Sequence, residues 1–140
     1  MSNRIVEMFV FDIFIAILKI EDIIKDFDSA DELLHSYRDW DSVIREYEII
    51  GEATKYLLNE NLIDMEYRKI VNFRNYITHG YFGIDSERVW SISQNGLLEL
   101  KVIILEIMKN IPDNLKKELI EAFIEDNKYI NFVVEELEKL

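Results

Sequence analysis

The chain has 140 residues, of which 49% are hydrophobic, four are glycine and one is proline. This length and composition predict one folded, helix-rich domain rather than a disordered chain. The absence of cysteine excludes disulfides, thiolate catalysis and cysteine-based zinc sites. The most apolar N-terminal run, from Met8 to Leu18, is interrupted by Asp12 and is shorter than the ~20 residues of a membrane span. It also lacks a signal-peptide cleavage pattern, so we expect a cytoplasmic protein.

The formal net charge of −12 disfavours nucleic-acid binding by the surface as a whole. Residues 66–90 hold four Lys or Arg against three acidic residues, so the other 115 residues carry −13. This segment is the least acidic part of the chain. It either marks a site for a polyanion or reflects chance, and an acidic exterior equally suits a basic protein partner.

The first predicted helix covers about residues 4–26 and is apolar around most of its circumference. Such a helix must be covered on more than one side, and in a domain this small we expect part of the cover from a second copy of the chain. Ser29 and Glu32 have the spacing of a capping box, which predicts a short helix to about His35 or Ser36. We interpret His35 as a structural or surface residue.

A third helix is predicted from about Asp39 or Asp41 to Asn59. Its buried face comprises Val43, Tyr47, Ile50, Thr54 and Leu57. Gly51 lies in the middle of this helix, where glycine costs ~1 kcal/mol relative to alanine. We therefore expect another helix to approach closely at Gly51.

Two acidic residues of this helix, Glu48 and Glu52, lie one turn apart on the same face. They either hold a partner arginine such as Arg74 or form a solvated pair that serves Arg45 and Lys55. The solvated pair is the simpler interpretation.

The fourth helix is predicted to begin after Asp64 as its N-cap and to end near Gly80. Its buried stripe comprises Ile70, Phe73 and Ile77. One polar face carries Arg68, Asn72, Asn75 and His79. At 100° per residue Arg74 lies about 140° around the axis from His79, so an ideal helix in a monomer would keep the two apart.

Three features allow Arg74 and His79 to act together. His79 can sit in a loosening last turn before Gly80. An arginine side chain can reach partway round a helix. A two-fold dimer can also assemble the site from both chains, or place two copies of it along one groove.

A fifth helix is predicted from the N-cap Asp85 to about Asn110, with a bend allowed at Gly96. Its core-facing candidates are Trp90, Leu97, Ile104 and Met108. After Pro112, the segment from Asp113 to about Leu137 predicts one final amphipathic helix. The expected fold is an all-α, up-and-down-like bundle of five to six helices that forms a single domain over residues 1–140.

The stretch from Phe73 to Asp85 contains Arg74, four further residues, His79, one residue and Tyr81, with the polar Asn75 directly after the arginine. This Arg-x4-His-x-Tyr pattern resembles the signature of the HEPN superfamily, and in particular that of the HepT-like ribonuclease toxins. Residues 41–53 and 81–90 resemble family blocks in the same order. The resemblance covers about the first four-fifths of the chain, and residues 113–140 lie beyond it.

The resemblance implies a homodimeric, metal-independent endoribonuclease toxin with Arg74 and His79 as catalytic residues. His79 would move a proton during attack by a ribose 2′-hydroxyl, and Arg74 would stabilise the charge on the phosphate. Asn75 and Tyr81 would bind the substrate, and the product would be a 2′,3′-cyclic phosphate. In the family a minimal nucleotidyltransferase antitoxin adds AMP to the tyrosine that Tyr81 matches. No cofactor or metal is implied.

Other interpretations of the same residues stay open. The second acid-base group would be the His79 of a second chain, Tyr81 or water. Without the resemblance, the cluster more simply indicates a capping and ion-pair arrangement. The alternative function is that of a non-catalytic subunit that binds a nucleotide or protein and supports a nucleotidyltransferase, with the motif retained for phosphate or nucleotide binding. We expect Tyr76 and Phe82 to be packing residues.

Overall fold

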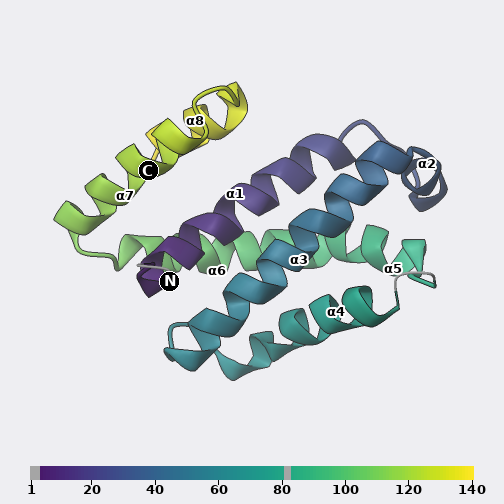
Figure 1. The fold of residues 1–140 in the computed structure, drawn as a ribbon, viewed down its shortest axis with the longest axis horizontal. Coiled ribbons are helices and arrows are strands. Elements are labelled where there is room, and N and C mark those ends of the chain that lie inside the picture. The colour runs from purple at the N-terminus through teal and green to yellow at the C-terminus, as the bar shows by residue number, and fades with distance from the viewer. Residues whose placement is uncertain (1–3, 81–82) are drawn as a thin grey trace.

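The computed structural model describes residues 4–80 and 83–140, which form helices and no strand. The elements are α1 (Val6–Ile24), α2 (Ala30–His35), α3 (Tyr37–Asn59), a 3₁₀ turn η1 (Met65–Tyr67), α4 (Arg68–His79), α5 (Ser86–Ser91), a π-helical segment η2 (Ile92–Gly96), α6 (Leu97–Lys109), α7 (Asp113–Asp126) and α8 (Asn131–Glu138). Helices α1, α3, α4 and α6 alternate in direction along the chain (Figure 1). This confirms the predicted all-α, single-domain fold.

The core is built around α1, which is apolar on most sides as the sequence predicts. Helices α3, α6, α7 and α8 all contact α1, and α4 packs on the far side of α3 (Figure 1). Ten of the 19 residues of α1 are buried by this arrangement. This chain thus supplies much of the cover of α1 itself, and the expectation that a second copy adds to it stays a prediction. Among the described helices, none combines the length and apolarity needed to cross a membrane.

Side-chain caps are present at three of the predicted helix starts, whereas α3 begins at Tyr37, before the predicted Asp39 or Asp41, and has no side-chain cap. Ser29 accepts a hydrogen bond from the Glu32 amide at 3.2 Å, and Glu32 in return accepts one from the Asp28 amide at 2.9 Å. Asp64 caps the η1 turn that leads into α4, and Asp85 caps α5. The sequence thus fixes where these elements begin through polar side chains that satisfy free backbone amides.

The fifth predicted helix is present as the continuous path α5, η2 and α6, with a π-helical turn where a bend at Gly96 was allowed. Within this turn the Ser93 hydroxyl donates to the Val89 carbonyl at 2.8 Å and lies 2.5 Å from the Tyr47 hydroxyl. A side chain that bonds to the carbonyl one turn earlier commonly perturbs a helix. The widened turn therefore coincides with the polar contact between η2 and α3.

The single C-terminal helix predicted from Asp113 to Leu137 is wrong, because the chain turns between α7 and α8. The Asn127 side chain donates to the Phe123 carbonyl at 2.8 Å and so ends α7. The turn folds α8 back so that Val133 and Leu137 are fully buried. Amphipathic periodicity runs through both helices, and it does not reveal the capping side chain between them.

Candidate functional site

The motif lies on α4, which stays α-helical up to His79. Gly80 is the C-cap, and its amide donates to the Tyr76 carbonyl at 2.9 Å. His79 is thus an exposed residue of the last helical turn, as predicted, but this turn does not loosen before it. The predicted polar face is confirmed, since Arg68, Asn72, Asn75 and His79 are all exposed.

Arg74 lies on the side of α4 that packs against α3. A Cβ atom built on Gly51 would be only 2.1 Å from the Cβ of Arg74 and 3.5 Å from its Cα. This confirms the expected close approach at Gly51 and identifies Arg74 as the residue that needs the space. Glycine at position 51 therefore sets how deeply the base of the Arg74 side chain is seated between the two helices.

The guanidinium group of Arg74 contacts both helices. Nη2 lies 3.5 Å from Oε2 of Glu52 on α3, and Nη1 donates to Oδ1 of Asn75 at 3.2 Å. Nε is buried and has no hydrogen-bond partner among the described residues. For Glu52 the simpler interpretation of a solvated pair is therefore wrong, because this carboxylate holds Arg74. The Arg74 side chain keeps 33% of its surface exposed, so a ligand can still reach it.

Arg74 lines a groove of about 250 Å³ between α1, α3 and α4. The other lining residues are Phe9, Asp12, Arg45, Glu48, Ile49, Glu52 and Ala53. Arg45 makes no ion pair within residues 4–80 and 83–140, whereas Asp12 lies 2.7 Å from Arg4. Burial raises the pKa of the Asp12 carboxyl group, and Arg4 partly opposes this shift.

Phe9 extends the groove with an aromatic surface. Its ring stacks on that of Tyr56, with a centroid separation of 4.3 Å and an interplanar angle of 6°. Tyr56 remains exposed. Sequence reasoning did not select Phe9 or Arg45 as site residues. For Arg45 a signal existed, because Arg45, Glu48 and Glu52 share one face of α3 that flanks Gly51.

The described contacts join Arg74 to Asn75 but do not join Arg74 to His79. Asn75 and His79 share the exposed face of α4 and are one turn apart. The side chain of Asn75 therefore links the guanidinium to the face that carries the imidazole. Tyr81, the fourth predicted site residue, lies outside the described residues.

Tyr76 has the packing role that the sequence predicts. Its hydroxyl accepts a hydrogen bond from the Asp85 amide at 2.8 Å, and its ring stacks with Phe73. The guanidinium of Arg88 lies over the same ring, 4.3 Å from its centroid. Tyr76 thereby fixes the start of α5 against α4. Phe82, the other predicted packing residue, lies outside the described residues.

Metal-ligating residues do not gather in the part of the chain that the structure describes. No group of three or more His, Cys, Asp or Glu residues there has a geometry that could hold a metal ion. The polar groups that line the groove are the guanidinium groups of Arg74 and Arg45 and the carboxylates of Asp12, Glu48 and Glu52.

A family model described as ribonuclease HepT-like matches residues 13–107. The match includes positions 74, 75, 79 and 81 and ends before α7. It thus covers the helices that build the groove, apart from the first turns of α1, and leaves out the α7–α8 hairpin.

Curated proteins of two archaea are similar to this chain. The "Putative RNase MJ1380" of Methanocaldococcus jannaschii is 34% identical over 104 residues, which is 72% of this chain and 94% of that protein. The "Putative RNase MJ0125" of the same organism is 28% identical over 81% of this chain and 99% of its own length. The "Probable ribonuclease HepT" of Thermococcus cleftensis is 33% identical over 43% of this chain and 57% of that protein. No solved structure matches.

Proposed function

This chain belongs to the HepT-like ribonuclease family, and from this premise we propose that it is an endoribonuclease that cleaves RNA at the groove of Arg74. The observation that carries the proposal is the family match over residues 13–107, which includes all four motif positions. The exposed imidazole of His79 and the accessible guanidinium of Arg74 support it. We further propose that the reaction needs no metal ion.

In the proposed reaction a ribose 2′-hydroxyl attacks the adjacent phosphorus. The O2′–P bond forms and the P–O5′ bond breaks, which leaves a 2′,3′-cyclic phosphate and a 5′-hydroxyl. His79 either takes the proton from O2′ or gives one to O5′, since an imidazole exchanges protons near neutral pH. The permanent charge of Arg74 stabilises the negative charge that builds on the phosphate oxygens.

Asn75 and Tyr81 are the proposed substrate-binding residues. The amide oxygen of Asn75 accepts from Arg74, so its amino group is left to donate to a phosphate or ribose oxygen. Tyr81 would stack on a base or donate to a phosphate. Farther along the groove, the Phe9–Tyr56 ring pair offers a surface on which a base of single-stranded RNA can stack, and Arg45 offers a second cation for a flanking phosphate.

The catalytic test uses purified protein and RNA in excess chelator. We expect cleavage by the wild type and a loss of at least about a hundredfold in His79→Ala, the range that proton-transfer groups contribute. His35→Ala is the matched control, because His35 is the other histidine and is exposed on α2. Equal cleavage by wild type and His79→Ala would remove His79 from the mechanism, and RNA left intact by the wild type would remove the nuclease proposal.

We also propose that the active form is a homodimer in which Arg74 of one chain and His79 of the other share a phosphate. The support is the separation of the two side chains around α4, because the described contacts do not join them within one chain. Mixing Arg74→Ala with His79→Ala chains then restores one intact site per mixed dimer, or about a quarter of wild-type activity. An inactive mixture that demonstrably contains mixed dimers would show that each site is built within one chain.

The proposed physiological role is that of a cytoplasmic toxin paired with a minimal nucleotidyltransferase antitoxin. Transfer of AMP to Tyr81 would place negative charge and bulk beside the phosphate site and so block RNA. Co-expression with a nucleotidyltransferase encoded nearby, followed by peptide mass spectrometry, should find AMP mass on the Tyr81 peptide and none in Tyr81→Phe. AMP found only on other peptides would contradict this role.

A second candidate is a non-catalytic subunit that binds a nucleotide or a protein and supports a nucleotidyltransferase. It is favoured by the net charge of −12 and by the contact of Arg74 with Glu52, where a carboxylate occupies a position that a phosphate oxygen would take. The chelator experiment separates the two candidates. If the wild type binds the nucleotidyltransferase but leaves RNA intact, the second candidate is correct.

A further inference from the structure

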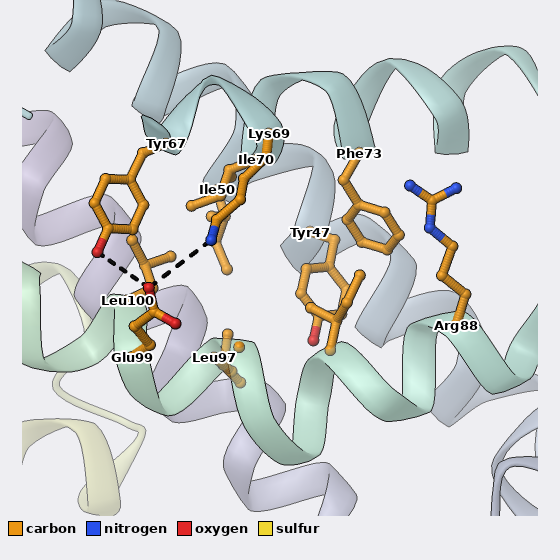
Figure 2. Close-up of a pocket in the computed structure, with 12 residues that line it drawn as sticks. Tyr47, Ile50, Tyr67, Lys69, Ile70, Phe73, Arg88, Leu97, Glu99 and Leu100 are labelled. Atoms are coloured by element: carbon orange, nitrogen blue, oxygen red, sulfur yellow. Dashed lines mark hydrogen bonds and ion pairs between the residues drawn. The ribbon is translucent and has the colours of Figure 1, made fainter. Parts of the chain in front are cut away.

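A second hollow, of about 300 Å³, is lined by Ile70 and Phe73 of α4 and shares no residue with the Arg74 groove. Figure 2 shows it between α4 and the path from η2 to α6, with Tyr47 and Phe73 in its middle. Its apolar wall also includes Ile50, Ile70, Ile92, Leu97 and Leu100. A volume of this size is at the lower limit of pockets that hold small organic ligands and is too small for a helix.

The wall of the hollow favours an apolar occupant. Aliphatic and aromatic side chains offer water few hydrogen-bond partners, and an apolar cavity of this kind tends to stay dry and to accept apolar molecules. The Tyr47 hydroxyl is held by Ser93, which leaves its ring to face the space. The body of the ligand would therefore be aliphatic or aromatic.

The two ends of the hollow differ in charge. At one end Lys69 lies 3.8 Å from Glu99, and the Tyr67 hydroxyl donates to the same carboxylate at 3.3 Å (Figure 2). The cation at that end is thus neutralised. At the other end stands Arg88, which makes no ion pair with any described residue and is held only over the rings of Tyr76 and Phe73, 4.3 and 5.4 Å from their centroids.

Arg88, like Arg45, has no ion pair among the described residues, although the sequence has 28 acidic and 16 basic residues. A free cation at the mouth of an apolar hollow is complementary to an anionic head group on an apolar body. The stack on two rings also orients Arg88 without using its hydrogen-bond donors.

We propose that this hollow binds a small molecule with an apolar body and one anionic group, a carboxylate or a phosphate, which pairs with Arg88. The site is separate from the Arg74 groove, because the two hollows share no lining residue. It does not depend on the proposed ribonuclease activity.

The test uses methyl-labelled protein and three probes with the same chain, namely octanoate, octanol and octylamine. NMR titration should shift the methyl groups of Ile50, Ile92, Leu97 and Leu100. Octanoate should bind about tenfold more tightly than octanol, as expected for one charge-assisted hydrogen bond, and octylamine should bind most weakly. A comparison of octanoate with octyl phosphate, which has the same eight-carbon chain, distinguishes the carboxylate from the phosphate head group.

Two variants and one control locate the interaction. Arg88→Gln should reduce octanoate binding to that of octanol, whereas Arg38→Gln, at an exposed arginine on α3, should leave it unchanged. Ile70→Phe should weaken the binding of all three probes, because the larger side chain fills part of the hollow. Circular dichroism of each variant checks that it is folded.

Three results would overturn the proposal. The first is the absence of shifts at the four methyl groups with every probe. The second is an equal preference for octanoate in wild type and Arg88→Gln. The third is a set of shifts caused by a short RNA and not by octanoate, which would assign the hollow to nucleic acid.

Discussion

The contacts of α4 with α3 and with α6 are built in opposite ways. Toward α3 the contact is so close that only glycine fits opposite Arg74, and the arginine is paired with Glu52. Toward α6 a hollow of about 300 Å³ remains, and Arg88 at its mouth has no acidic partner among the described residues. The tight side fixes the position of the proposed catalytic guanidinium, and the loose side leaves room for a ligand. One helix thus lines both a rigid site and an adaptable one.

The largest expected effect tests the tight side. Gly51→Ala places a methyl group 2.1 Å from the Cβ of Arg74, and the crowding atoms are at the base of that side chain rather than at its flexible end. Overpacking costs ~1–3 kcal/mol and the gain in helix propensity returns ~1, so we expect a net loss of up to about 2 kcal/mol in urea unfolding.

Gly96→Ala is the matched control for this experiment. The nearest atom to a Cβ at position 96 is 3.8 Å away, which is an ordinary contact. This variant should be as stable as the wild type or more stable by up to ~1 kcal/mol. Equal losses at both glycines would show that α3 and α4 are not as closely seated as described.

The next effect concerns Tyr47 on the loose side and the pH dependence of its contribution to stability. Tyr47 is only 4% exposed, and burial raises the pKa of its hydroxyl above the ordinary 10.0, with the Ser93 hydrogen bond opposing the shift. Because the folded pKa is raised, this contribution to stability is complete below pH 10 and is lost as the pH rises through the folded value.

Tyr47→Phe should cost about 1 kcal/mol at neutral pH, since it removes one hydrogen bond while Ser93 keeps its bond to the Val89 carbonyl. The difference in free energy of unfolding between Tyr47→Phe and wild type should shrink above pH 10, because phenylalanine does not ionise. Urea unfolding across the alkaline range measures this, with Tyr129→Phe as the control at an 89% exposed tyrosine. A constant deficit at all pH values would contradict the assigned role of Tyr47.

A smaller effect is expected from the ion pair on the tight side. Glu52→Gln should change the free energy of unfolding by less than about 1 kcal/mol, because both partners are partly exposed. It should strengthen RNA binding a few-fold at low salt, since it removes a carboxylate that competes with phosphate for Arg74. Fluorescence anisotropy with labelled RNA measures this, and exposed Glu118→Gln is the control. Weaker RNA binding would instead show that Glu52 holds Arg74 in its productive position.

The smallest effect is expected where the hollow offers space. Ile70→Phe adds volume on the loose side, so we expect its stability to stay within about 0.5 kcal/mol of wild type. Ile77→Phe adds the same groups to the same helix at a residue that is 1% exposed and should cost about 1–3 kcal/mol. Similar losses for the two variants would mean that the hollow closes in solution.

Much of the tight side was predictable from the sequence. A glycine in the middle of an otherwise regular helix has few explanations other than close packing, and the capping residues Ser29, Asp64 and Asp85 mark helix starts through local hydrogen bonds. The same local rules missed the turn at Asn127, because the pattern of apolar residues continues on both sides of it. They also favoured the wrong interpretation of Glu52, since the choice between solvent and Arg74 depends on how α3 and α4 are seated.

The loose side was not predictable. Ile70, Phe73, Leu97 and Leu100 have the spacing of core residues, and periodicity cannot distinguish a filled core from one that surrounds a space. The unpaired state of Arg88 likewise depends on distances between elements. For the motif itself, the sequence correctly placed His79 at the helix end and on the opposite flank from Arg74. That the two act together across a dimer is our proposal, and one helix does not reveal it.

The α7–α8 hairpin restricts which assemblies are possible. It lies along α1 on the side remote from α4 (Figure 1) and buries Leu119, Val133 and Leu137. A relative without such a segment would present that flank of α1 to its surroundings, but this chain has already occupied it. A partner therefore cannot reach this flank of α1 directly, whereas α4 and the motif lie on the side that the hairpin leaves uncovered.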